Sequence, residues 1–418
     1  MKQELRAALD ALGPESGRIF TQIFPDAAAS SEGALSGLQI SVKDNIDVAG
    51  YTTAAASWVF RDHAPAREDA PVVQRLRAAG AVIFAKTNMS EFAYSTHGIN
   101  AHYGMPANPH DSHGPRIPGG SSSGAGVAVA RGLGEAAIGT DTAGSVRIPA
   151  ALCGVVGLKP RQRRIPRQGV VPLSESLDCV GVIARSVERV ARVFEAIADE
   201  DRDAPPRERG RRLKIAVPSG AGSPTDGLRD ESVMLAFEKA LQRLALDPRF
   251  ELIPTPLPLI GEGLALATDG GISAPEAFAF HRPYLERSRH LYDPFTLYRL
   301  GFGERCSEER YRGLLARRRA AILRTREELG EYDAIAFPTC PIVAPRVADV
   351  GAADVLAAVN AQLLRHTVPA NVLDLASITL PCAHLHPMSA GPVGLSLDSV
   401  HGEEGLLEAA AAVEQAIS

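Results

Sequence analysis

Apolar and polar positions near the start of the chain predict strands and helices in succession. Residues 37–43 (GLQISVK) alternate with the period of two that is typical of a strand. Residues 70–79 have the pattern of a helix, with Pro71 near its beginning and Gly80 after its end. Residues 81–85 (AVIFA) are continuously apolar, as in a buried strand. This strand–helix–strand order predicts a layered α/β core.

The rest of the chain continues the same patterns around one long loop. Residues 97–124 are rich in Gly, Pro, Ser, Asn and His, which predicts a loop, and long loops in compact domains are often functional. We predict further helices at 125–133, 230–246, 307–329 and 403–417, a short helix at the N-terminus, and strands at 135–140 and 332–338, with the α/β pattern resuming at 213–220.

We expect a single domain over residues 1–418, because no internal repeat recurs at a fixed period. The charged, Pro-containing stretch 199–212 is expected to be an exposed connector within it. The N-terminal residues lack the apolar core of a signal peptide, and no stretch has the length of a membrane-spanning helix. We therefore expect a cytoplasmic protein that makes no membrane contact.

Composition narrows the classes of function. Hydrophobic residues at 45% and charged residues at 22% are ordinary for a globular protein. The net charge of −5 gives no basic field to gather nucleic acid, so we expect no direct nucleic-acid contact. The five cysteines form no CxxC pair, and His102, His110 and His113 have poor ligand spacing, so we predict no metal site.

Three segments carry candidate chemistry. Lys43 ends the predicted strand 37–43, Ser121 lies in the run GGSSSG at 119–124, and Ser145 ends the run GTDTAGS at 139–145. A serine hydroxyl is a weak nucleophile that needs a base, and these segments contain no histidine. A lysine can act as that base if burial keeps it neutral, and a second serine can pass the proton between them. Only six lysines occur in the chain, so few compete for this role.

The small residues before Ser145 suit acyl transfer, although each segment also has a simpler explanation. A tight turn can direct successive backbone N–H groups at a developing oxyanion, where the loss of one donor costs about 3–4 kcal/mol. Taken singly, the Gly-Ser run could be a flexible loop, Lys43 a solvated charge and Ser145 a helix cap. The run also lacks the terminal Gly-Lys of a phosphate-binding P-loop.

The order and spacing of these segments resemble the amidase-signature family of serine hydrolases. The matching stretches within 37–187 are GLQISVKDN, KTNMSEFAY (86–94), NPHD (108–111), residues 118–160 and GVVPLSESLDCVGVIARSV (169–187). The resemblance implies a layered α/β/α fold in which helices cover a large, mixed, twisted central sheet. It implies that residues 37–187 form the catalytic core and that about 200–330 form a variable substrate-specificity region.

The same resemblance implies the roles of individual residues. Lys43, Ser121 and the nucleophile Ser145 would form the catalytic triad, with a cis peptide bond before Ser121. The oxyanion hole would consist of the backbone N–H groups of Thr142, Ala143, Gly144 and Ser145. Substrate contacts are expected from Tyr94, Thr96, Arg147 and Arg299. For Tyr94 and Thr96 loop packing is an equal alternative, and for Arg147 the alternative is a structural salt bridge.

The implied activity is hydrolysis of a small-molecule carboxylic amide to an acid and ammonia or an amine, through a seryl acyl-enzyme. No metal or organic cofactor is expected. Aliphatic, aryl and urea-derived amides stay open as substrates, as do some esters. Alternatives are the glutaminase (A-type) subunit of a glutamyl-tRNA amidotransferase, which touches nucleic acid through its partners, and a catalytically silent scaffold relative.

Two departures from the family pattern affect these expectations. Ala143 stands where many relatives have Gly, which narrows the site beside the oxyanion hole and would carry strain if the backbone needed a positive φ. Only 42 residues precede Lys43, fewer than in many relatives. This short N-terminus puts in doubt any dimer contact built from it, so a homodimer stays open.

Overall fold

One large sheet forms the centre of the computed structural model. The structure describes residues 1–29, 31–111, 114–201, 211–220, 228, 230–386 and 389–418. The eleven strands lie in the order β1-β3-β2-β4-β6-β5-β10-β11-β9-β7-β8. Parallel pairs such as β2 and β4 occur beside antiparallel pairs such as β4 and β6, so the predicted mixed sheet is confirmed. The strands are β1 (Phe20–Ile23), β2 (Gln39–Lys43), β3 (Val82–Thr87), β4 (Ala136–Asp141), β5 (Val156–Lys159), β6 (Cys179–Ala184), β7 (Leu213–Pro218), β8 (Phe250–Thr255), β9 (Ala334–Pro338), β10 (Ala376–Pro381) and β11 (Gly394–Ser399).

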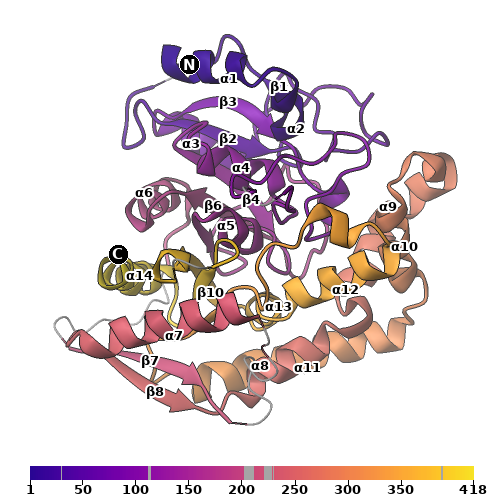
Figure 1. Cartoon of the computed structure of the whole chain (residues 1–418). Helices are drawn as coiled ribbons and strands as arrows, with labels where there is room; N and C mark the ends of the chain where they lie inside the picture. The colour runs from indigo at the N-terminus through magenta and orange to yellow at the C-terminus, as the bar shows by residue number, and fades with distance from the viewer. Residues whose placement is uncertain (30, 112–113, 202–210, 221–227, 229, 387–388) are drawn as a thin grey trace.

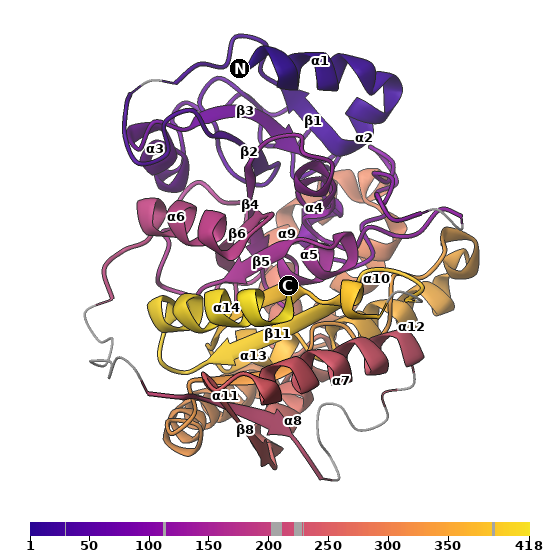
Figure 2. The ribbon, with the colours of Figure 1, turned by 60° about the vertical axis from the view of Figure 1, so that its left-hand side comes forward.

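Helices cover both faces of this sheet (Figure 1). On one face α3, α6, α14 and α7 form a row in which each helix contacts the next (Figure 2). On the other face α4 and α5 pack over one half of the sheet, and α8, α11 and α13 pack near β9. The α-helices are α1 (Gln3–Ala11), α2 (Ser16–Ile19), α3 (Pro71–Ala78), α4 (Ser123–Ala130), α5 (Arg147–Cys153), α6 (Val187–Ile197), α7 (Glu231–Leu246), α8 (Pro258–Leu266), α9 (Ser273–Ser288), α10 (Pro294–Glu304), α11 (Glu308–Glu328), α12 (Ala353–Leu364), α13 (Val368–Val372) and α14 (Glu403–Ile417).

The predicted unit over residues 37–85 is observed as β2, α3 and β3, with β2 parallel to β3. Pro71 opens α3, where its missing N–H costs no helical hydrogen bond, and Gly80 follows the helix at a φ of 91°. In β2 the alternate side chains of Ile40 and Val42 lie in the core that α3 and α6 cover. The side chain of Lys43 therefore leaves the strand on the opposite face, which α4 covers.

The carboxyl ends of β2 and β4 meet at one edge of the sheet. The two strands are parallel neighbours, with Val42 opposite Ile138. Lys43 is the last residue of β2 and Asp141 the last residue of β4. In open α/β sheets, ligands bind in the crevice outside the carboxyl ends of the strands, and this edge is therefore the first place to look for a site.

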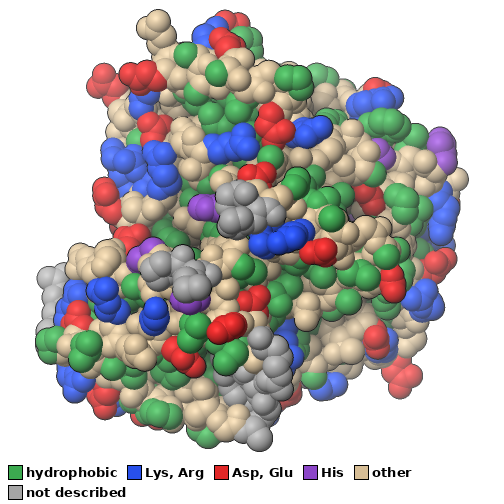
Figure 3. All heavy atoms as spheres, viewed as in Figure 1, with side chains coloured by type: hydrophobic (Ala, Val, Ile, Leu, Met, Phe, Trp, Pro, Cys, Tyr) green, Lys and Arg blue, Asp and Glu red, His purple; other side chains and the backbone are tan. Residues whose placement is uncertain are grey.

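The surface carries charged side chains of both signs (Figure 3). The face in Figure 3 carries basic and acidic side chains intermixed. Among the described residues, no helix is both long enough and apolar enough to cross a membrane. Part of the connector predicted at 199–212, namely residues 202–210, lies outside the described residues, as does His113.

A glycine at the start of α4 tests how closely this helix must approach the end of α2 and the segment after β3. A Cβ at Gly124 would lie 2.2 Å from the carbonyl oxygen of Ile19 and 2.7 Å from the backbone nitrogen of Asn88. We expect Gly124→Ala to lower the free energy of unfolding by about 1–3 kcal/mol or more, because backbone atoms must move to make room. Denaturant unfolding measures this change.

Gly313→Ala is the matched control. Gly313 is exposed within α11, and a Cβ there would meet no atom within 4 Å. This change should raise the free energy of unfolding by about 0.5–1 kcal/mol, because alanine restricts the unfolded chain and favours the helix. Equal effects of the two substitutions would contradict the close packing of α4.

Candidate active site

The amine of Lys43 contacts the hydroxyl of Ser121 at the carboxyl edge of β2. Lys43 Nζ lies 2.7 Å from Ser121 Oγ, 2.8 Å from Thr140 Oγ1 and 3.3 Å from the carbonyl oxygen of Thr140. Asn45 Nδ2 donates to the same threonine hydroxyl at 3.1 Å. Lys43 and Ser121 are fully buried. The peptide bond between Gly120 and Ser121 is cis, as predicted.

Burial changes the charge state of this lysine. It lowers the pKa of Lys43 to about 7, against the opposing influence of the Asp141 and Asp178 carboxylates, which raise it. In a substantial fraction of the molecules the Lys43 amine is therefore uncharged at neutral pH. An uncharged amine has a lone pair, and the nearest hydroxyl that can donate to it is Ser121.

Ser145 lies between the end of β4 and the start of α5, beside the Ser121 segment. The backbone N–H of Ser122 donates to the carbonyl oxygen of Ser145 at 3.1 Å, which holds the two serine segments together. Ser145 is 4% exposed, whereas Ser121 is completely enclosed. Of the two serines, Ser145 is therefore the one that an incoming molecule can reach.

The turn before Ser145 depends on Gly144 and not on the neighbouring alanine. Gly144 has a φ of 136°, and a Cβ there would lie 2.3 Å from Thr367 Oγ1. Ala143 is not among the described residues with positive φ, so the strain considered for it does not arise. Its carbonyl oxygen accepts from Thr367 Oγ1 at 2.6 Å, which fixes the turn against the segment that precedes α13.

The buried carboxylate of Asp141 organises the same turn. Asp141 Oδ1 accepts from the backbone N–H of Gly144 at 2.7 Å, and Oδ2 accepts from Val146 N at 3.1 Å. The N–H of Gly144 is thus engaged within the turn, which modifies the expectation that it faces an oxyanion. Among the described residues, the N–H groups of Thr142, Ala143 and Ser145 have no hydrogen-bond partner.

Arg147 belongs to the support of this turn. It is fully buried, and its guanidinium donates to Asp141 Oδ1 at 3.0 Å, to Asn371 Oδ1 at 2.6 Å and to Ser377 Oγ at 3.2 Å. Burial alone would raise the pKa of Asp141, but the charge and hydrogen bonds of Arg147 hold that pKa well below its ordinary value. These contacts are those of the structural salt bridge that was the alternative explanation for Arg147.

Asp178 is a residue of the site that the sequence did not indicate. Its Oδ1 accepts from Thr142 Oγ1 at 2.6 Å, and its Oδ2 accepts from the N–H groups of Leu173 and Ser174 at 2.9 and 3.1 Å. Burial raises the pKa of Asp178 to about 6. The only signal in the sequence was its place in the SESLD stretch, which gives no hint that it meets Thr142.

A cavity of about 330 Å³ opens beside the turn, with Ala143 in its wall. Its other walls come from the end of α8, the α8–α9 connection, the start of α9, α10, α12 and the start of α13. The contribution of α12 and α13 falls outside the region 200–330 in which we expected specificity. The lining residues are Ala143, Leu264, Ala267, Thr268, Asp269, Gly270, Ser273, Phe295, Tyr298, Arg299, Phe302, Ala357, Asn360, Ala361, Leu364 and Val368.

Among the residues expected to touch substrate, Arg299 lines this cavity, and Tyr94 and Thr96 are buried behind it. The guanidinium of Arg299 lies 4.9 Å from the centre of the Tyr94 ring, and Arg299 Nε has no hydrogen-bond partner among the described residues. Thr96 donates through its N–H and its hydroxyl to Asn360 Oδ1, at 2.9 Å in each case. Tyr94 and Thr96 thus support groups that line the cavity.

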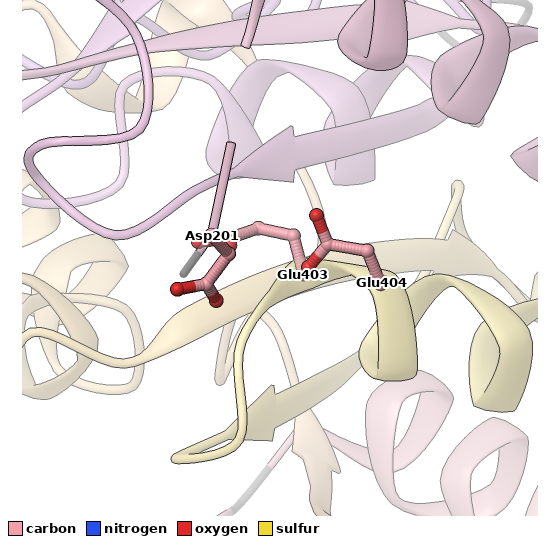
Figure 4. A group of neighbouring side chains, drawn as sticks. All are labelled: Asp201, Glu403 and Glu404. Atoms are coloured by element: carbon pink, nitrogen blue, oxygen red, sulfur yellow. The ribbon is translucent and has the colours of Figure 1, made fainter. Parts of the chain in front are cut away.

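A cluster of acidic side chains elsewhere in the fold already has protein partners. Asp201, Glu403 and Glu404 lie together (Figure 4). Arg161 and Arg164 form ion pairs with these carboxylates. The two guanidinium groups offset the negative charge that would attract a cation, so the cluster is a network of ion pairs.

The histidines considered as metal ligands are engaged as well. His102 Nε2 lies 3.0 Å from Glu91 Oε1, and His110 Nε2 lies 3.1 Å from the carbonyl oxygen of Cys153. The two rings have different hydrogen-bond partners, so these contacts do not direct them at one shared ligand position. Each contact occupies a ring nitrogen that a metal ion would need.

Comparisons with known proteins show the family of this chain. The family profile described as Amidase matches residues 1–407. The chain is 36% identical over 371 residues to a 2-amino-5-chloromuconic acid deaminase of Comamonas testosteroni, covering 87% of this chain and 78% of that one. It is 34% identical over 399 residues to the A-type subunit of a glutamyl-tRNA(Gln) amidotransferase of Symbiobacterium thermophilum, covering 87% and 79%. The crystal structure of an amidase superposes with a TM-score of 0.86 at 31% identity, covering 100% and 95%. The chain therefore belongs to the amidase family, and it is an enzyme of the amidohydrolase class.

Proposed function

We propose that this protein hydrolyses a small-molecule amide to an acid and ammonia or an amine, with Ser145 as the nucleophile. One observation carries the proposal: the fully buried amine of Lys43 lies 2.7 Å from Ser121 Oγ, where burial lowers its pKa to about 7. A base with a pKa near the operating pH is effective in general base catalysis. A lysine buried at this position without a catalytic role would lower the stability of the fold, because the burial of an amine that is charged in water costs free energy.

The proton path follows from the order of these groups. Neutral Lys43 accepts the proton of Ser121 while Ser121 accepts the proton of Ser145, so the Ser145 oxygen attacks the amide carbonyl carbon. The C–N bond then breaks, the proton returns through Ser121 to the leaving nitrogen, and an ester to Ser145 remains. Water then attacks the ester carbon, and its proton passes to Lys43 through Ser121. The C–O bond to Ser145 breaks, Ser145 regains its proton, and the acid is released. The hydrogen bond between the Ser122 N–H and the Ser145 carbonyl oxygen supports the required closeness of the two serines.

The oxyanion of the tetrahedral intermediate would be held by the turn between β4 and α5. The N–H groups of Thr142, Ala143 and Ser145 have no hydrogen-bond partner among the described residues, as donors for an oxyanion require. Gly144 supplies the backbone conformation of the turn, and its own N–H is taken by Asp141. The buried Asp141–Arg147 pair fixes the donors in advance, so little reorganisation is needed during the reaction.

The cavity beside this turn favours a small amide that carries a carboxylate. About 330 Å³ suits a small molecule, and the wall contains the cation of Arg299, whose Nε lacks a partner among the described residues. Two relatives are named for molecules with carboxylates: a deaminase of 2-amino-5-chloromuconic acid and a component of a glutamyl-tRNA amidotransferase. We therefore propose that Arg299 binds the carboxylate of the substrate.

The similarity to the A-type component of the amidotransferases also favours a second candidate, in which this chain supplies ammonia within a complex. The two candidates differ in what the chain does alone. Turnover of free amides by the purified chain, with acid and ammonia both measured, supports the stand-alone amidase. Glutaminase activity that appears only with partner proteins supports the second candidate.

The nucleophile is tested by Ser145→Ala. We expect at least a 1,000-fold loss of turnover, roughly the scale on which the loss of a catalytic nucleophile acts. The free energy of unfolding should change little, because no described side-chain hydrogen bond depends on this hydroxyl. Hydrolysis of a panel of aliphatic, aryl and carboxylate-bearing amides measures the effect. Wild-type rates in the variant would disprove the assignment.

The base is tested by the pH dependence of kcat/KM. Activity requires neutral Lys43, so it should be full above a pKa of about 7 and fall tenfold for each pH unit below it. The direction follows from burial, which disfavours the protonated amine. A profile that stays flat down to pH 5 would rule out Lys43 as the base.

A second electrostatic test uses Asp178, whose carboxylate raises the pKa of Lys43. In Asp178→Asn the amide oxygen can still accept from Leu173 and Ser174, and the hydroxyl of Thr142 can turn to accept from the amide nitrogen. Removal of the negative charge should therefore shift the acid limb of kcat/KM to lower pH. A shift to higher pH, or no shift, would contradict the proposed effect of the Asp178 carboxylate on Lys43.

A further inference from the structure

The side chain of Asn360, near the end of α12, faces the cavity with a fixed orientation. Asn360 is 1% exposed and lines the cavity. Its Oδ1 accepts two hydrogen bonds from Thr96, one from the backbone N–H and one from the hydroxyl, at 2.9 Å in each case. A backbone N–H can only donate, so the atom that meets it must be the amide oxygen and not the nitrogen. The nitrogen Nδ2 therefore points away from Thr96.

Nδ2 carries two donor protons and has no hydrogen-bond partner among the described residues. The neighbouring Arg299, from α10, has a buried Nε that is unpartnered among the described residues. Buried donors in folded proteins almost always have partners, and such an exception calls for a ligand, a solvent molecule or a functional reason. Asn360 and Arg299 line the same cavity.

Two polar groups of this wall, Asn360 Nδ2 and the Arg299 guanidinium, can only donate. The one acidic side chain in the lining, Asp269, is largely exposed and lies 3.7 Å from the guanidinium of Arg310. Thr268 and Ser273 add hydroxyl groups, which can donate or accept, and the rest of the lining is apolar or aromatic. A molecule that satisfies such a wall must bring acceptor oxygens, and two donor groups with one positive charge match a carboxylate.

We propose that Asn360 is a specificity-determining residue whose Nδ2 donates to a carboxylate oxygen on the acyl part of the substrate. Thr96 is a positioning residue that holds the amide so that Nδ2 faces the cavity. This inference rests on the function proposed above and adds to it the class of substrate: half-amides of short dicarboxylic acids, in which the carboxylate lies at the end of the acyl chain opposite the scissile amide.

A purely structural role is the competing explanation, because the Thr96–Asn360 contact also joins the loop after β3 to α12. Asn360→Asp separates the two roles. The carboxylate keeps two acceptor oxygens for Thr96, so the joint is retained, but the donor is replaced by a negatively charged acceptor. A structural role would leave ligand preference unchanged in this variant.

The experiment measures labelling of Ser145 by an uncharged fluorophosphonate and the protection that amides give against it. Succinamate and glutaramate serve as the carboxylate-bearing probes, and butyramide serves as the neutral probe. In the wild type we expect a half-amide to protect at lower concentration than butyramide does. In Asn360→Asp we expect the half-amide to need an about 10–100-fold higher concentration for the same protection, which is the scale of one hydrogen bond to a charged group. The concentration of butyramide that protects should not change.

Two controls complete the design. Gln362→Glu adds the same charge to the exposed part of α12, outside the cavity lining, and should leave all protection unchanged. Thr96→Val removes one of the two contacts to Asn360 Oδ1 and should weaken protection by the half-amide with little change in the labelling rate. For any half-amide that is turned over, Asn360→Asp should raise KM much more than it lowers kcat.

The outcomes distinguish this inference from the proposed function. If Ser145 is not labelled in the wild type, the proposed function fails. If Ser145 is labelled normally but half-amides protect no better than butyramide, or Asn360→Asp leaves their advantage intact, the role of Asn360 is overturned and the acyl-enzyme chemistry stands. A loss of protection that Gln362→Glu reproduces would also overturn it.

Discussion

The burial of Lys43 at the carboxyl ends of β2 and β4 is the constraint on which the rest of the site depends. Burial lowers the pKa of Lys43 from 10.5 to about 7, a change that corresponds to the order of 5 kcal/mol against the charged form. The protein bears this cost in the native state, and the surrounding hydroxyl and carbonyl groups of Ser121 and Thr140 lie within hydrogen-bond distance of the amine.

The sequence predicted the parts of the fold whose causes are local. Alternation over residues 37–43, Pro71 at a helix start and the apolar run 81–85 each act over a few residues, and β2, α3 and β3 follow them closely. The large mixed sheet was expected from the resemblance and not from these patterns, because pairs such as β5 with β10 join segments far apart in the chain. No local period records which distant strand will be the neighbour.

The candidate site divides in the same way. Lys43, Ser121 and Ser145 lie in segments of recognisable order, and the structure brings Lys43 to Ser121 as expected. The side chains of Asp178 and Asn360 gave no such signal, because their importance lies in partners reached only after folding. Arg147 shows the converse: its position two residues after Ser145 suggests a substrate contact, yet its guanidinium donates to buried acceptors.

Two separate sets of buried polar groups therefore surround the substrate region, and they differ in whether they are satisfied. Around the turn of residues 141–147, the Asp141 carboxylate and Arg147 guanidinium meet partners on every side, which makes that turn rigid. Across the cavity, Arg299 Nε and Asn360 Nδ2 lack partners among the described residues. Since an unsatisfied buried donor such as Arg299 Nε costs free energy, the cavity wall gains stability when a molecule supplies an acceptor to it. In the function that we propose, the same contrast separates the residues that support the chemistry from those that select the substrate.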